Sequence, residues 1–215
     1  MAITRLGSNQ AINLANNVTG TLPTANASNG WVEIASASND DATTHVLSLD
    51  FSTYNIIKVY WSVGITSSDS LVWSVSTDNF SSVTNLDGMY SYFQVNNAGG
   101  TSNGNQAQPN DGLNEQYIKI TANQIAGDNV FGESVFKGGT FHSNGSETRR
   151  NQFMFRHDCV THQGTGIYTE RVNSHGQIAR ALAGSESTTP THCRWHEIGG
   201  ANIEFSYRQF GLKTS

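Results

Sequence analysis

The sequence predicts an all-β protein: an antiparallel β-sandwich of the jelly-roll type, preceded by an extended N-terminal arm. Short runs with alternating apolar and polar residues are separated by clusters of Asn, Asp, Gly and Ser, which is the pattern of strands and turns. No stretch shows the sustained i, i+3, i+4, i+7 apolar spacing of an amphipathic helix. Aromatic residues reach 10% while charged residues stay at 13%, which favours a packed core over disorder.

Residues 1–30 are predicted to form the arm. They alternate small polar residues with isolated Ile, Leu and Val, and the passage "GTLPTANASNG" is rich in turn-forming residues and contains a proline. The period-two pattern begins with "GWVEIASAS", so the compact domain is expected to start near Trp31. The chain therefore divides into an arm, 1–30, and a sandwich domain, 31–215, a length that one β-sandwich can fill.

The clearest strand is "IIKVYWSVGI", residues 56–65, in which every second residue is apolar. The segments 45–51 and 70–76 repeat this alternation. Trp61 and Trp73 fall in phase with their apolar neighbours, so both are expected in the core.

The later part of the chain continues with segments of strand length. The candidates are 89–95, 115–121, 132–141, 151–160, 166–172, 191–198 and 201–212. The passage "HGQIARALAG", 175–184, is the one short helical candidate, and 96–114 is too long for a hairpin turn and is expected to be an exposed loop. About ten strands with regular turn signals predict a jelly roll.

Three passages resemble small structural proteins of tailed bacteriophages, including those that infect marine bacteria and cyanobacteria. The opening "ITRLGSNQAINLANNVTGTLPTAN" resembles their N-terminal arm. The body "ASNDDATTHVLSLDFSTYNIIKVYWSVGITSSDSLVWSVSTDNFSS" resembles a pattern of acidic turn, two strands, polar turn and a strand ending in "VSTD", and "IEFSYRQFGLK" resembles the final strand. The middle of the chain shows no such similarity.

The resemblance implies a non-enzymatic component of the virion, assembled in the cytoplasm of the host bacterium. It implies a homotrimer that attaches to other virion proteins through residues 1–30. The favoured role is a tail fibre or spike that contacts a glycan or protein of the host surface. The alternative is a capsid decoration protein that stabilises the head.

Two Cys-x-x-His pairs, Cys159 with His162 and Cys193 with His196, have the spacing of half a zinc site each. In an extended strand, however, positions three apart point to opposite faces. A shared metal would therefore require the strand to break between Cys159 and His162. We expect no metal and no cofactor, and the sequence leaves open whether the two cysteines are free, bridged or metal-bound.

Three aromatic residues are candidates for contact with a surface ligand. Trp195 lies in the polar string "HCRWHE", and Tyr90 and Tyr92 lie beside the predicted long loop. Flat aromatic side chains suit the apolar face of a sugar ring.

Several functional classes are disfavoured. The chain has no Gly-x-Ser-x-Gly elbow, P-loop, His-Glu-x-x-His or dinucleotide fingerprint, and its adjacent Asp40 and Asp41 are interpreted as turn residues. A polysaccharide-binding or polysaccharide-degrading module remains a further alternative. The net charge of -5 without a basic run argues against nucleic acid, and no run approaches the roughly 20 apolar residues needed for membrane insertion.

Overall fold

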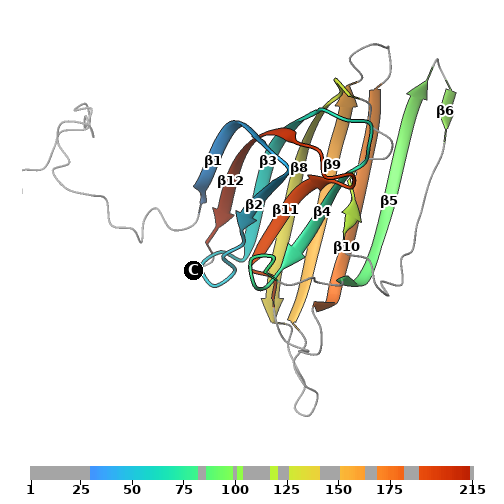
Figure 1. The fold of residues 1–215 in the computed structure, drawn as a ribbon. Coiled ribbons are helices and arrows are strands. Elements are labelled where there is room, and N and C mark those ends of the chain that lie inside the picture. The colour runs from blue at the N-terminus through green and yellow to red at the C-terminus, as the bar shows by residue number, and fades with distance from the viewer. Residues whose placement is uncertain are drawn as a thin grey trace, which may run out of the picture.

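The computed structural model describes residues 30–81, 86–98, 101–103, 117–120, 126–140, 151–162, 169–181 and 189–213. Within these residues all the regular secondary structure is β (Figure 1). The strands are β1 (Trp31–Ala42), β2 (Thr44–Ser48), β3 (Ile56–Ile65), β4 (Leu71–Ser76), β5 (Leu86–Ala98), β6 (Thr101–Asn103), β7 (Ile118–Lys119), β8 (Asn129–Thr140), β9 (Asn151–His162), β10 (Thr169–Ala181), β11 (His192–Glu197) and β12 (Ile203–Leu212).

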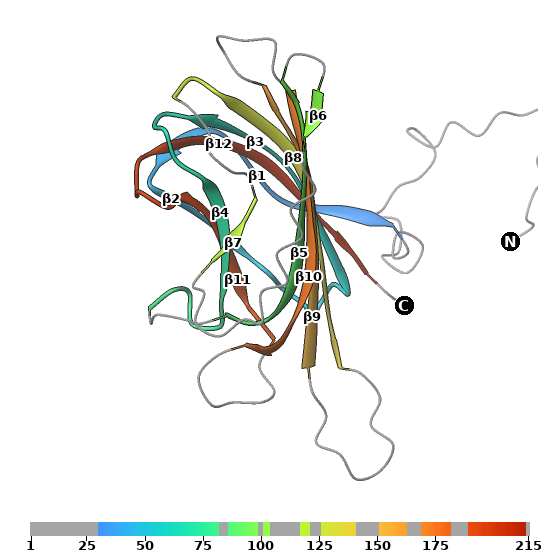
Figure 2. The same ribbon diagram turned by 90° about the vertical axis from the view of Figure 1, so that its right-hand side faces the viewer.

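The strands form two antiparallel sheets that face each other, which confirms the predicted β-sandwich. The large sheet has the order β1-β12-β3-β8-β9-β10-β5-β6, and the small sheet has the order β2-β11-β4-β7. Figure 2 shows the large sheet nearly edge-on, with the small sheet packed against one of its two faces only. The other face of the large sheet is called the outer face below.

The pairing of the strands is that of a jelly roll. Setting β5, β6, β9 and β10 aside leaves eight strands, and among these the first pairs with the last, β1 with β12. The same nesting continues inward, because β2 pairs with β11, β3 with β8 and β4 with β7. An antiparallel ribbon rolled up on itself gives this order. The remaining four strands extend the large sheet beyond β8.

The core lies between the two sheets and follows the period-two alternation. In β3 the odd-numbered residues are buried, as predicted from the sequence, and Trp61 is 4% exposed. From the small sheet, the fully buried ring of Trp73 packs against the large-sheet rings of Phe136 and Phe153, which also stack on each other. Its ring centroid lies 5.3 Å from that of Phe136 and 5.9 Å from that of Phe153, in stacked geometry. Such aromatic contacts stabilise the core beyond the area they bury.

One glycine is required by this packing. Gly132 of β8 is the direct cross-strand partner of Trp61 on β3. A Cβ atom added to Gly132 would lie 2.3 Å from Cζ2 of the indole, which is far inside van der Waals contact. The indole therefore occupies the space that any side chain at position 132 would need.

Two segments of the chain differ from the secondary structure predicted for them. The predicted helix at 175–184 is wrong for the residues that the structure describes, because residues 175–181 belong to β10, which pairs with β9 on one side and β5 on the other. The start of the predicted loop 96–114 lies in β5 and β6, and most of its remainder lies outside the described residues. β1 begins at Trp31, the expected domain boundary, while residues 1–29 lie outside the described part.

Candidate interaction face

The outer face of the large sheet carries an unusual number of exposed apolar side chains. Tyr60, Phe131, Met154 and Val160 are between 38% and 55% exposed, and Trp31 at the start of β1 is 46% exposed. They come from β1, β3, β8 and β9. Those of β3, β8 and β9 alternate with the buried residues of their strands and therefore lie on the outer face. Trp31 lies on the same face, because its ring is within cation–π range of Lys58. No element of the described part of the chain covers this face. Apolar patches of this kind mark interaction sites more often than single exposed residues do.

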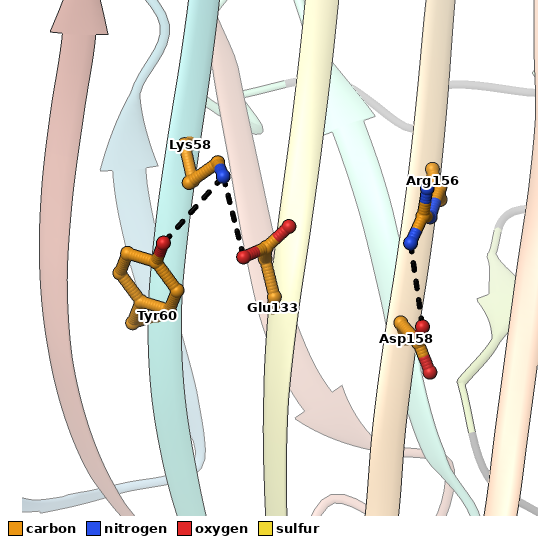
Figure 3. Close-up of polar contacts among 5 residues, drawn as sticks. All are labelled: Lys58, Tyr60, Glu133, Arg156 and Asp158. Atoms are coloured by element: carbon orange, nitrogen blue, oxygen red, sulfur yellow. Dashed lines mark hydrogen bonds and ion pairs between the residues drawn. The ribbon is translucent and has the colours of Figure 1, made fainter. Parts of the chain in front are cut away.

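Fixed charges lie among these apolar side chains. Lys58 Nζ forms an ion pair with Glu133 Oε2 at 3.3 Å, and Arg156 Nη2 donates a hydrogen bond to Asp158 Oδ2 at 3.3 Å (Figure 3). Lys58 Nζ also donates to the hydroxyl oxygen of Tyr60 at 3.5 Å. The face is therefore chemically mixed, with apolar contacts and oriented charges of both signs.

Lys58 organises the aromatic part of the face. Its ammonium group lies 5.4 Å from the ring centroid of Trp31 and 5.5 Å from that of Tyr60, which is within cation–π range. Partial burial opposes ionisation, but the hydrogen bond and ion pair with Glu133 outweigh it and raise the pKa of Lys58 above its ordinary value. The group therefore stays charged at neutral pH and occupies one side of both rings.

Strand register sorts the charges of the face into two adjacent rows across β3, β8 and β9. The first row holds Tyr60, Glu133 and Asp158, and the second holds Lys58, Val135 and Arg156. The charged members of the first row are both acidic and those of the second are both basic. Because paired strands lie about 4.8 Å apart, each row forms a continuous line of side chains across the sheet.

The structure does not bring Cys159 and His162 together as a metal half-site. Cys159 is 2% exposed and points into the core, where its thiol donates a weak hydrogen bond to the carbonyl oxygen of Ile120 at 3.8 Å. β9 continues through His162, so the break that a shared metal requires does not occur. The His162 side chain itself lies outside the described residues.

Cys193 and His196 lie on opposite faces of β11, as the period-two argument predicts. Cys193 is fully buried in the core, whereas His196 is partly exposed on the other side, with Nε2 3.2 Å from Ser74 Oγ. Burial lowers the pKa of His196. Cys159 and Cys193 are both free thiols, and no group of three or more His, Cys, Asp or Glu side chains in the described part of the chain is placed to hold a metal.

The prediction that Trp195 contacts a surface ligand is wrong. Its side chain is 0% exposed and packs against Phe205, with the ring centroids 5.4 Å apart. The polar neighbours His192, Arg194 and His196 belong to the other face of the strand, because β11 alternates strictly between partly exposed and buried positions. Tyr90 and Tyr92 lie in β5, and their side chains fall outside the described residues.

A buried polar chain also escaped sequence reasoning. The indole Nε1 of Trp61 donates to Ser134 Oγ at 2.7 Å, and Ser134 Oγ forms a 2.7 Å hydrogen bond with His157 Nδ1, whose direction is set by the imidazole tautomer. His157 is 1% exposed, and burial lowers its pKa from 6.5 to about 3, so the ring is neutral. The period-two alternation places His157 on the same face of β9 as Cys159, so the sequence itself indicates that His157 points into the core.

Comparison with protein-family models, with curated proteins and with solved structures yields no match. Within the described residues no helix is long and apolar enough to cross a membrane.

Proposed function

We propose that this protein is a non-enzymatic structural component of a tailed-phage virion, of the tail fibre or spike type, whose sandwich domain works through protein contacts. The observation that carries the proposal is the outer face of the large sheet, where five large apolar side chains surround paired charges. The similarity of the N-terminal segment, the first strands and the last strand to phage structural proteins supplies the biological setting. Residues 1–30 then attach the domain to other virion proteins.

Physical chemistry favours an assembly role for such a face. Exposed apolar surface is less favourable in free energy than buried apolar surface by about 25 cal/mol per Å². Covering the outer face with a partner is therefore favourable. The two ion pairs hold their charged groups in fixed positions on the sheet. Charges fixed in this way favour a protein with complementary charges and disfavour other proteins. Both properties suit a protein that occupies one fixed place in a particle.

A glycan partner is a weaker interpretation of the same face. Stacking of a sugar needs free aromatic surface, and Lys58 already lies over one side of both Trp31 and Tyr60. A polysaccharide-binding or polysaccharide-degrading module would show itself by binding or cleaving host capsular polysaccharide in solution. We expect neither activity from the purified sandwich domain.

Quantitative mass spectrometry of purified particles tests the proposal. The protein should be present, at a few dozen copies or fewer for a fibre or spike, whereas hundreds of copies would instead assign it to decoration of the capsid. Deleting residues 1–25 should prevent incorporation and leave the sandwich folded. A protein that is absent from the particles overturns the proposal, and incorporation of the deletion variant overturns the role of the arm.

A further inference from the structure

We infer that two copies of this chain associate face to face through the outer face of the large sheet, about a two-fold axis that crosses the strands. The proposed function assigns protein contacts to this face, and the inference identifies the contacting protein as a second copy of the chain. To that extent the inference rests on the proposed function. Its basis is that the rows of side chains on this face are complementary to themselves.

The position of the axis follows from the register. Four residues that face the core lie side by side in one line across the sheet, between the acidic row and the basic row. They are Gln209, Val59, Ser134 and His157, on β12, β3, β8 and β9. A two-fold axis that runs parallel to this line, just outside the outer face, places each strand over the same strand of the second copy. The two strands then run in opposite directions. The acidic row of one copy then lies over the basic row of the other.

The strongest contact in this arrangement forms on β9. Asp158 faces Arg156 of the second copy, and Arg156 faces Asp158 of the second copy, which joins two existing ion pairs into a ring of four alternating charges. Such networks stabilise more than isolated exposed pairs, because the side chains are already oriented. The contact is isologous, as two-fold symmetry requires.

Further pairs of outer-face residues also meet in this arrangement. On β3, Lys58 faces Tyr60 of the second copy, and farther out on β9, Val160 faces Met154. Arg208 faces Phe210 on β12, and Phe131 faces Lys137 on β8. Cation–π and apolar pairs therefore flank the central ion network, and no like charges meet among these pairs.

The alternative two-fold axis, parallel to the strands between β8 and β9, fails on charge. It would place Glu133 over Asp158 of the second copy, and like charges that face each other in an interface cost several kcal/mol. The axis across the strands instead puts Asp158 over Arg156 of the second copy. Packed sheets are rotated by up to about 30° relative to each other, which displaces residues more the farther they lie from the centre of the contact. The match is therefore best near the axis, where Arg156 and Asp158 lie.

The extent of the face suits a weak homodimer. From β1 to β9 five strands at about 4.8 Å spacing span about 19 Å, and the seven residues from Phe131 to Lys137 span about 20 Å. This footprint, about 380 Å² on each partner, is smaller than that of standard specific interfaces and falls among weak, transient contacts. Association should therefore depend on concentration and weaken as salt screens the ion network.

Sedimentation equilibrium of the full chain over a wide concentration range tests the inference. The wild type should form dimers, and Val160→Glu should weaken the dimer at least tenfold. The matched control is Val46→Glu, which changes an equally exposed valine on the outer side of the small sheet and should leave the dimer intact. Equal weakening by both variants, or no weakening by Val160→Glu, overturns the assignment of the face.

Charge exchange tests the two-fold geometry itself. Arg156→Asp gives two acidic residues and Asp158→Arg gives two basic residues, so each variant alone should be monomeric. A mixture of the two should form heterodimers, because each acid again faces a base. Absence of heterodimers, a monomeric wild type, or a trimer overturns the inference, whereas the proposed function fails separately if the protein is missing from particles.

Discussion

His157 is a neutral imidazole enclosed by aromatic rings, and this environment makes the stability of the protein depend on pH. Its pKa is about 3 in the folded protein against 6.5 in an exposed chain, so between these values the unfolded state binds the additional proton. Stability is therefore lost progressively as the pH falls from about 6.5 to about 3. The loss approaches about 1.4 kcal/mol per pH unit from this one group.

The variant His157→Asn isolates this contribution. An Asn side chain can still form a hydrogen bond with Ser134, as acceptor through its oxygen or as donor through its nitrogen, but the residue does not titrate. We expect lower stability at neutral pH because of the lost ring volume, and a shallower decline of the unfolding free energy between pH 6.5 and 3, measured by urea titration. The exposed His175→Asn serves as control and should keep the wild-type slope, and a wild-type slope in His157→Asn would contradict the assignment.

The two cysteines should be chemically silent in the folded protein. Cys159 and Cys193 are buried free thiols, and burial raises the pKa of Cys193 well above its ordinary value, so the reactive thiolate is suppressed. A colorimetric thiol reagent should find no reactive thiol in native protein and two after denaturation. Rapid labelling of the native protein would show that one of these side chains reaches solvent.

At the scale of elements, β3 and β8 are locked by the contact between Trp61 and Gly132. Gly132→Ala places a methyl group where the indole lies, so it should destabilise the protein by about 1–3 kcal/mol, the usual cost of overpacking. Gly30→Ala is the control, because nothing lies within 4 Å of the position of its Cβ, and it should have no such effect. Chemical denaturation of the two variants measures the difference.

The strands were largely predictable because burial on one face imposes a period of two that is visible in the residues. β3 matches its predicted bounds, 56–65, since every second residue from Ile57 to Ile65 is apolar and buried. The helical prediction for 175–184 failed because local propensity from Ala, Leu and Ile is weak against pairing with a strand on each side. Long-range pairing of this kind leaves no signature within ten residues.

The candidate face was not predictable from the sequence, because it joins residues from strands far apart in the chain. Lys58 and Glu133 become neighbours only through the register of β3 with β8. Trp195 could have been placed correctly, since the alternation that puts His196 on one side of β11 puts Trp195 on the other.

For the whole molecule, the pairing of the first and last strands closes the fold. β12 lies between β1 and β3 in the large sheet, so its removal would expose the edges of both and open the core. Deletion of residues 203–215 should abolish folding, whereas deletion of 214–215, which follow the end of β12, should not. Circular dichroism and resistance to proteolysis would distinguish the two, and a folded protein without β12 would contradict this view of the fold.

The unequal burial of the tryptophans has an optical consequence. Of the four, Trp61, Trp73 and Trp195 are at most 4% exposed, and Trp31 at 46% alone lies open to water, on the outer face. A water-soluble quencher such as iodide should therefore remove only the red-shifted part of the emission, which belongs to Trp31. Intrinsic fluorescence thus provides a built-in reporter of whatever covers that face, without any label.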